Sequence, residues 1–274
     1  MHFDCGSYQL DLACPRVMGI VNVTPDSFSD GGRYASTQLA IEHGVRLVAE
    51  GADILDIGGE STRPGAEPVP LDEELKRVIP VIEGLVNLVD VPISIDTYKP
   101  EVMRAAIAAG ADLINDVQAL QEPGALEAVA SSNAGVCLMH MLGTPQTMQT
   151  DPQYDDVVAE VLEFLRLRAE AAVAAGIARE RIMLDPGFGF AKRSVHNIAL
   201  LRELPKLCAL GYPVLAGLSR KSVLGHITGN RVEDRLPPSI AAAVVAVMKG
   251  AGVVRVHDVK ATKDALAVVA AIID

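Results

Sequence analysis

Short apolar runs recur along the chain, and each ends in polar or glycine residues. The runs are nearly continuous rather than alternating, which is typical of parallel strands covered on both faces. Each is followed by a segment rich in Ala, Leu and Glu with the apolar spacing of a helix. The pattern predicts strands at Arg16–Asn22, Ile54–Gly58, Ile93–Asp96, Leu113–Asp116, Val136–His140, Ile182–Asp185, Val214–Gly217 and Val253–Val256.

The segments between these runs predict helices with recognisable ends. Asp72, Glu73 and Glu74 open one helix with the carboxylates that its N-terminal dipole favours. Pro100 suits a first helical turn, because that position needs no N–H donor. Helices are expected at Gln38–Glu50, Asp72–Asn87, Pro100–Ala109, Ala125–Ser131, Asp155–Ala175, Ser194–Leu210, Ser239–Lys249 and Thr262–Ile272.

Eight strands that each precede a helix predict an α/β fold, the (β/α)8 TIM barrel. One domain over residues 1–274 is expected, because barrels routinely occupy about 200–250 residues and no linker-like stretch divides the chain. The residues before Pro15 should form a short cover over the N-terminal end of the barrel. The competing open sheet should carry a phosphate-binding glycine motif, but Gly187–Lys192 lacks the third glycine and no P-loop motif occurs.

Composition narrows the range of partners. The 24 Lys and Arg against 35 Asp and Glu give a net charge of −11 without a basic stripe, which disfavours nucleic acid and anionic membranes. The longest apolar stretch, Ile240–Met248, is shorter than the roughly 18 residues of a membrane span. The four cysteines lack metal or redox spacing, and the first residues lack a signal-peptide pattern. We therefore expect a reduced cytoplasmic protein.

Polar residues close nearly every predicted strand. In a barrel the C-terminal strand ends form the active site, so these side chains are expected to converge. A single Asp or Asn there is more often a turn residue or helix cap, and Asp56 and Asp116 are candidates for such support. Converging carboxylates need a cation, a metal or an N–H-rich ligand to neutralise them. The strand-end residues are Asn22, Asp56, Asp96, Asn115, Asp116, His140, Asp185, Ser219, Arg220, Lys221, Arg255 and His257.

These strand-end groups divide by chemistry. Asp96, Asn115 and Asp185 supply acceptors that suit a heterocycle with several N–H donors, such as an aminopyrimidinone. Lys221 can donate to the carbonyl oxygen of that ring. A second set suits a phosphate-type anion and a hard metal ion, and it consists of Asn22, Thr62, Arg63, Arg255 and His257. The expected substrate therefore contains both an N–H-rich heterocycle and a phosphate-type anion.

Two long loops, Val23–Gly32 and Gly59–Ala66, follow the first two strands. Both mix Gly and Pro with hydroxyl and charged residues, so we expect functional lids.

Lys221 has a rival interpretation as a Schiff-base nucleophile of an aldolase-like enzyme, whereas its neighbour Arg220 favours anion or carbonyl contacts. The histidines lack zinc-binding spacing, so a stable zinc site is not expected.

Eight blocks, in order along the chain, carry a family pattern. They are Met18–Gly32, Asp56–Gly65, Ser94–Thr97, Ile114–Val117, Leu138–Met141, Asp185–Phe190, Gly217–Ser222 and Arg255–Asp258. As an ordered set they resemble dihydropteroate synthase of the folate pathway, over nearly the whole chain from Val17 onward. The resemblance implies condensation of 6-hydroxymethyl-7,8-dihydropterin pyrophosphate with 4-aminobenzoate to 7,8-dihydropteroate and pyrophosphate, assisted by Mg²⁺.

The resemblance also implies three groups of site residues. The pterin would lie against Asp96, Asn115, Asp185 and Lys221, with Met139 and Val117 as walls. The pyrophosphate would contact Asn22, Thr62, Arg63, Arg255 and His257, with Asn22 as the Mg²⁺ ligand. The 4-aminobenzoate pocket would contain Phe28, Pro64, Phe190 and Ser219, with Lys221 at its edge.

The residue chemistry suits this reaction. An arylamine is neutral near pH 7 and needs no general base, so the main demand is departure of pyrophosphate, which Mg²⁺ and cationic groups assist. Asp96 and Asp185 can stabilise the cationic pterin that remains, and Lys221 and Arg255 complete the expected catalytic set. The alternatives are a pterin-binding methyltransferase domain and a non-catalytic pterin-binding paralogue. The resemblance further implies a sulfonamide target and a homodimer formed through the late helices.

Overall fold

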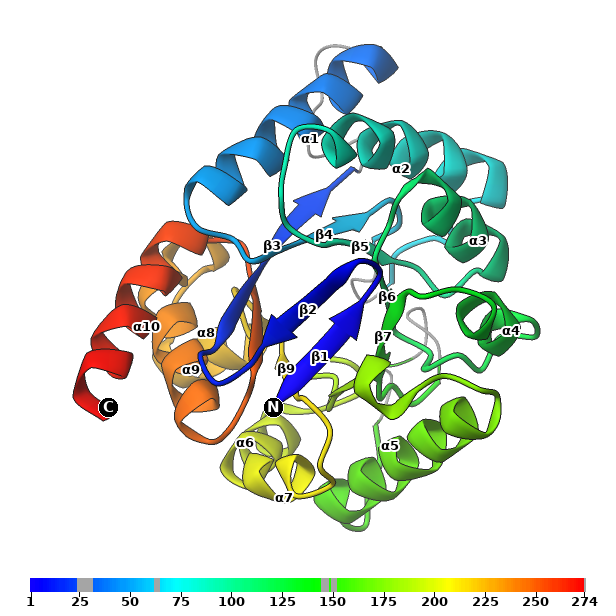
Figure 1. The fold of residues 1–274 in the computed structure, drawn as a ribbon. Helices are drawn as coiled ribbons and strands as arrows, with labels where there is room; N and C mark the ends of the chain where they lie inside the picture. Colours follow the sequence, from blue (N-terminus) through cyan, green and yellow to red (C-terminus); the bar gives the residue numbers. More distant parts are fainter. Residues whose placement is uncertain (24–31, 62–64, 144–147, 149–151, 274) are drawn as a thin grey trace.

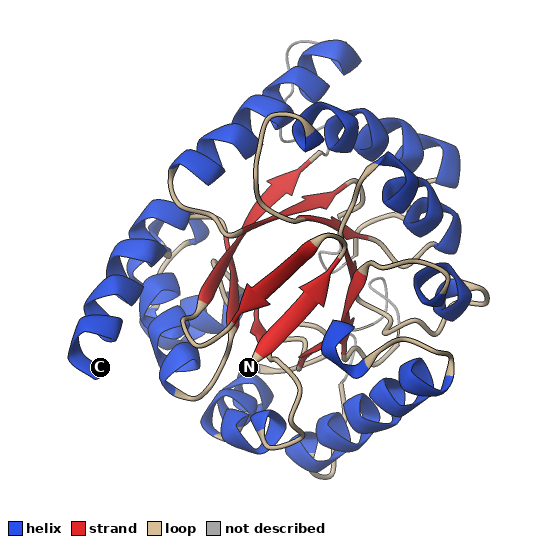
Figure 2. Ribbon diagram, in the orientation of Figure 1, coloured by secondary structure: helices blue, strands red, loops and turns tan. Residues whose placement is uncertain are grey.

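The computed structural model describes residues 1–23, 32–61, 65–143, 148 and 152–273. In these residues, eight parallel strands form an inner layer that helices surround (Figure 1, Figure 2). This arrangement confirms the predicted TIM barrel. The strands are β3 (Arg16–Asn22), β4 (Ile54–Gly58), β5 (Ile93–Asp96), β6 (Leu113–Asp116), β7 (Gly135–Met139), β8 (Ile182–Asp185), β9 (Leu215–Ala216) and β10 (Val253–Val256).

The sheet closes almost completely on itself. Neighbouring strands pair in the order β8-β7-β6-β5-β4-β3-β10-β9. An isolated parallel bridge between Leu184 and Val214 joins the two ends of this order, and the Leu184 N–H donates to the Pro213 carbonyl at 2.9 Å. The predicted strand Val214–Gly217 is longer than β9, because its pairing with β8 is reduced to this bridge.

Most predicted strands match the observed ones residue for residue, because buried parallel strands are apolar runs with polar ends. The strand predicted at Val136–His140 lies one residue earlier. Its first residue is Gly135, which pairs with Leu113 despite having no side chain to mark it as part of a strand. A Cβ on Gly135 would lie 2.7 Å from Phe3 Cζ, so only glycine fits this close approach.

Helices form the outer layer, and the one predicted at Ser194–Leu210 is divided at Glu203. Pro205 is the cause, since its ring cannot continue a helix interior. The short helix after Lys221 was not predicted, and Gly229 ends it at φ 76°. No helix in the described ranges is both long and apolar enough to cross a membrane. The helices are α1 (Gly32–Ala49), α2 (Leu71–Val86), α3 (Pro100–Ala109), α4 (Ala125–Ala130), α5 (Val157–Ala174), α6 (Ser194–Arg202), α7 (Leu204–Cys208), α8 (Ser222–Thr228), α9 (Leu236–Met248) and α10 (Val259–Ile273), with 3-10 turns Arg179–Arg181 and Val232–Asp234.

A β-hairpin forms the predicted N-terminal cover. Its strands β1 (His2–Cys5) and β2 (Tyr8–Asp11) are antiparallel and lie across one end of the barrel (Figure 1). Phe3 and Cys5 are fully buried in one apolar cluster with residues near the N-terminal ends of the barrel strands. Those residues are Met18, Ile54, Leu113, Cys137, Met183, Leu215 and Val253. The hairpin therefore closes this end with apolar contacts.

Candidate active site

The register of the strands gathers polar residues at the opposite, C-terminal end. Gly58 pairs with Asp96, and Asp96 pairs with Asn115 on the next strand. On the other side Gly58 pairs with Asn22. A Cβ on Gly58 would lie 3.7 Å from Asn22 Oδ1 and 3.8 Å from Asp96 Cβ. Asn22 and Asp96 therefore flank the space that this glycine leaves.

Asp56 is the centre of the hydrogen bonds in the barrel mouth. It is fully buried, and its Oδ1 accepts from Ser94 Oγ at 2.6 Å. Its Oδ2 accepts from Asn115 Nδ2 at 3.1 Å and from Arg255 Nε at 2.6 Å. Asp56 thus has the supporting role expected of it, and it orients Asn115 so that the amide oxygen is the remaining acceptor.

Arg255 joins the carboxylates of two neighbouring strands. Besides Asp56 it contacts Asp96, where an Nη donates to Oδ2 at 2.9 Å. These bonds use two of its five N–H donors and offset the repulsion between the two carboxylates. A Cβ on Gly217 would lie 3.8 Å from both Arg255 Cβ and Lys221 Nζ, so this glycine leaves space between the two cationic side chains.

Asp96 is the buried acceptor that stands out. It is 8 % exposed, and among the described residues its Oδ1 has no hydrogen-bond partner. Burial raises the pKa of Asp96 above its usual range; Arg255 opposes this shift and the Asp56 carboxylate adds to it. A buried acceptor without a donor costs about 1–3 kcal/mol. An N–H group of a ligand would remove that cost.

Asp185 and Lys221 form the second charged group. Asp185 Oδ1 accepts from the Gly187 N–H at 2.7 Å, and burial raises the pKa of Asp185 while Lys221 opposes the rise. Lys221 Nζ donates to the Phe188 carbonyl and lies 4.7 Å from the centroid of the Phe190 ring. Burial lowers the pKa of Lys221 to about 8, against the effect of Asp185. Lys221 is therefore a donor whose charge is sensitive to mildly alkaline pH.

Ser219 fixes the position of His257. Ser219 Oγ lies 3.0 Å from His257 Nδ1, and it accepts from the His257 backbone N–H at 3.2 Å. The adjacent Arg220 has a different role, because both of its bonded nitrogens donate to Asp258, at 2.6 and 3.1 Å. The structure therefore assigns Arg220 to an ion pair with Asp258 and brings Ser219 together with His257.

An apolar wall lies beside these polar groups. Val117 and Met139 are each 3 % exposed and belong to one cluster with Ala191, against which Phe190 packs. The structure thus places the two predicted wall residues together, with Phe190 next to them.

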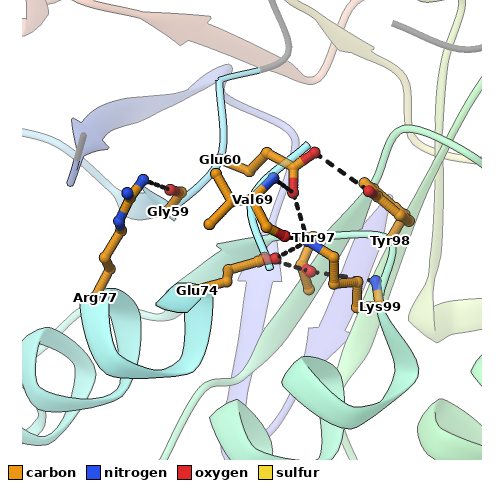
Figure 3. A network of polar contacts seen from close by, with 8 residues as sticks. All are labelled: Gly59, Glu60, Val69, Glu74, Arg77, Thr97, Tyr98 and Lys99. Carbon is orange, nitrogen blue, oxygen red and sulfur yellow. Dashed lines mark hydrogen bonds and ion pairs between the residues drawn. The ribbon is translucent and has the colours of Figure 1, made fainter. Parts of the chain in front are cut away.

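A buried charge network holds the segment that follows β4 (Figure 3). Lys99 Nζ contacts the carboxylates of Glu60 and Glu74 and donates to the Val69 carbonyl at 2.8 Å. The side chains are 15, 7 and 1 % exposed for Lys99, Glu60 and Glu74. Although burial disfavours the charged form, the two carboxylates raise the pKa of Lys99.

Further bonds reinforce this network. Thr97 Oγ1 donates to Glu74 at 2.7 Å, and Tyr98 donates to Glu60 at 3.2 Å (Figure 3). Arg77 donates to the Gly59 carbonyl at 2.9 Å. Both ends of the stretch 59–69 are therefore tied to α2 and to the start of α3.

Comparisons with known proteins agree with this architecture. Residues 18–257 match the family model described as pterin binding enzyme. The dihydropteroate synthase of Escherichia coli K12 is 52 % identical over 262 residues, covering 96 % of this chain and 93 % of that protein. The chain belongs to the dihydropteroate synthase family.

Solved structures of dihydropteroate synthases have the same fold. The enzyme of Xanthomonas albilineans with 4-aminobenzoic acid has a TM-score of 0.94 and 58 % identity, covering 99 % of this chain and 97 % of that one. The Yersinia pestis enzyme in a sulfonamide drug complex has a TM-score of 0.94 and 49 % identity, covering 99 % of each chain. Family membership also decides against the aldolase-like interpretation of Lys221.

Four of the predicted dihydropteroate synthase residues belong to the two loop sequences that follow β3 and β4. Phe28, Thr62, Arg63 and Pro64 lie outside the described residues. Of the rest, the barrel mouth brings together the pterin set, Asn22 and Arg255, and it pairs Ser219 with His257.

The ion pair between Asp56 and Arg255 was not predicted from the sequence. Asp56 and Arg255 each interrupt an apolar strand run, in Ile54–Gly58 and Val253–Val256. A charge inside a buried strand needs a partner. Two charges of opposite sign, each inside an apolar strand, are the signal in the sequence that pairs these residues.

Proposed function

We propose that this protein is an active dihydropteroate synthase, in which pyrophosphate leaves the dihydropterin substrate and the nitrogen of 4-aminobenzoate replaces it. The observation that carries the proposal is the buried Asp96 Oδ1 without a donor among the described residues, in the barrel mouth of a chain of this family. A related structure from Xanthomonas albilineans contains 7,8-dihydropteroate, with a TM-score of 0.90 and 55 % identity. The expected product is the same.

The pterin ring would be held by acceptors on three strands. Asp96 Oδ1, the amide oxygen of Asn115 and the carboxylate of Asp185 can accept from ring N–H and amino groups. Lys221 can donate to the ring carbonyl, and Met139 and Val117 would form the apolar walls. In this arrangement Asp96 Oδ1, which has no donor among the described residues, would accept a hydrogen bond from the substrate.

The pyrophosphate would be bound at the rim by Asn22, Thr62, Arg63, Arg255 and His257. Among the described residues, no group of three His, Cys, Asp or Glu side chains could hold a metal ion. Asn22 Oδ1, which borders the space that Gly58 leaves, would hold Mg²⁺, and one amide oxygen suits an ion that prefers few protein ligands and many phosphate or water oxygens. When bound, Mg²⁺ would neutralise the charge that develops on the leaving pyrophosphate.

The substitution needs no protein nucleophile. The bond from the pterin methylene carbon to the pyrophosphate oxygen breaks, and both electrons leave with pyrophosphate. Asp96 and Asp185 would stabilise the cationic pterin electrostatically, and Arg255 favours the ionised form of Asp96 against the effect of burial. The lone pair of the arylamine then forms the carbon–nitrogen bond, and its proton passes to solvent. Phe28, Pro64, Phe190 and Ser219 would position the arylamine.

We also propose a homodimer formed through the late helices and a cytoplasmic location. The outer surfaces of α9 and α10 expose large apolar side chains, which are Val245 at 38 %, Met248 at 64 %, Val268 at 60 % and Ile272 at 78 %. Helices α9 and α10 contact each other, and exposed large apolar side chains on neighbouring helices are typical of a protein interface. Light scattering at micromolar protein should give a dimer mass, and a monomer mass would refute the assembly.

The test of the function is release of pyrophosphate. We expect release to require both the pterin pyrophosphate and 4-aminobenzoate, and to stop when excess chelator removes Mg²⁺. Full activity in chelator would refute the metal role. Pterin binding without any release would instead indicate a non-catalytic relative.

A further inference from the structure

The segment between β8 and α6 has an unusual backbone. Gly187, Gly189 and Ala191 have φ values of 68°, 80° and 49°. The left-handed region is rare for a residue with a side chain, as at Ala191, because the Cβ then crowds the backbone. A Cβ on Gly187 would clash with the His140 carbonyl oxygen. Contacts with the rest of the protein must therefore hold this segment in place.

Lys192 supplies the central contact. Its Nζ donates to the Phe190 carbonyl at 3.0 Å and to the His140 carbonyl at 3.2 Å, and it lies 2.9 Å from His140 Nδ1. Three acceptors match the three donors of an ammonium group. Because His140 follows β7 and Phe190 follows β8, one side chain joins the ends of two neighbouring strands.

The surroundings of Lys192 are unusual for a lysine. The side chain is 3 % exposed, and it forms no ion pair among the residues that the structure describes. Fully buried lysines are rare unless a carboxylate compensates the desolvation. Burial lowers the pKa of Lys192 to about 7, although the Asp185 carboxylate opposes this shift, and burial together with Lys192 lowers the pKa of His140 to about 3, which leaves a neutral imidazole as acceptor. The hydrogen bonds of this buried group fix the conformation of the segment that carries Phe190.

Two further side chains hold the same segment. Asn197 accepts from the Gly189 N–H at 2.7 Å and donates to the Lys192 carbonyl at 3.1 Å. Tyr154 donates to the Ala191 carbonyl at 2.9 Å. These bonds hold the backbone on both sides of Phe190, whose ring lies 4.7 Å from the Lys221 ammonium.

We propose that Lys192 is a positioning residue for the second substrate, holding Phe190 as a wall of the 4-aminobenzoate pocket and the Phe188 carbonyl against Lys221. The inference rests on the proposed function, in which Phe190 borders 4-aminobenzoate. Lys192 acts through the backbone of its segment and need not touch either substrate.

The test is Lys192→Met, which keeps the length of the side chain and removes its donors. We expect the KM for 4-aminobenzoate to rise about 10- to 100-fold, as small misplacements near a reaction centre can cost that much, while the KM for the pterin pyrophosphate changes less than about threefold. Tyr154→Phe removes one bond to the same segment and should raise the same KM less. Lys263→Met, at the opposite barrel end, is the matched control and should change neither KM.

Several outcomes would overturn the proposal. A folded Lys192→Met enzyme with an unchanged KM for 4-aminobenzoate, or with both KM values raised equally, would leave Lys192 without this role. If Lys192→Met does not fold, an unchanged KM in Tyr154→Phe decides against it. A parent enzyme that releases no pyrophosphate refutes the proposed function alone. In that case a crystal structure of Lys192→Met still decides, because an unmoved Phe190 ring beside Lys221 would contradict the positioning role.

Discussion

The two ends of the barrel are built from the same strands and differ in chemistry. At the N-terminal end, inward-facing residues such as Ile54, Leu113 and Val253 are apolar and covered by the hairpin. Two residues further along each strand come Asp56, Asn115 and Arg255. Side chains two residues apart point to the same face of a strand. Within two residues along each of these strands, the barrel interior thus changes from an apolar layer under the hairpin to a layer of charged and polar side chains.

This contrast separates stability from function. The apolar layer is packed by side chains of the protein itself, whereas the charged layer contains a buried acceptor without a donor among the described residues. Substitutions in the first layer should therefore reduce stability with little effect on the folded enzyme. Substitutions in the second should reduce activity while the fold persists.

The largest effect is expected from Asp96→Asn. The amide keeps the shape, but it removes the charge that stabilises the cationic pterin and presents a donor to Arg255 or to the ring. We expect kcat/KM to fall about 10³-fold or more, in line with the loss of a key electrostatic group. Pyrophosphate release measures this, and circular dichroism checks the fold. Retention of a tenth of the activity would remove Asp96 from the mechanism.

Phe3→Ala should produce the largest loss at the other end. Phe3 is fully buried, and truncating such a ring costs about 3–5 kcal/mol of unfolding free energy. Denaturant unfolding measures the loss, and the KM values of the folded variant should stay at those of the parent. Large changes in KM would show that the two layers are not independent.

Lys99→Met should have an intermediate effect on stability. It leaves the buried carboxylates of Glu60 and Glu74 without their cation. Breaking a buried pair costs about 3–5 kcal/mol, and some remaining exposure of Lys99 reduces this to about 2–3 kcal/mol. Denaturant unfolding is again the measurement. The account of this network is wrong if stability is unchanged.

Alkaline pH should weaken activity through Lys221. Burial lowers the pKa of Lys221 to about 8, so the ammonium is present below this pH and is lost as the pH rises through it. We expect kcat/KM to fall about tenfold per pH unit above about 8. In Lys221→Arg the charge persists, so the residual activity should show no such fall. A flat profile in the parent enzyme would exclude a charged Lys221 from the reaction.

The smallest effect is expected from Lys263→Met. Lys263 is one-third exposed, and its partner Asp53 also accepts from Arg16 and from the Val17 N–H. Such a pair contributes about 0–1 kcal/mol. A loss above about 2 kcal/mol in denaturant unfolding would show that this end depends on charge as well.

The sequence predicted the barrel because its signals are local. The apolar runs with polar ends identified β4, β5 and β6 to the residue, and the polar ends supplied the candidate site residues. Contacts between distant segments were not predictable in this way. The bonds of Arg255 to Asp56 and of Lys192 to His140 depend on register and loop conformation, which residue spacing does not specify.

A crystal structure of this protein with 7,8-dihydropteroate tests the central claim most directly. We predict that Asp96 Oδ1 lies about 2.7–3.2 Å from a pterin nitrogen, the distance of a normal hydrogen bond. A product bound elsewhere, or a pterin that makes no contact with Asp96 Oδ1, would contradict the account.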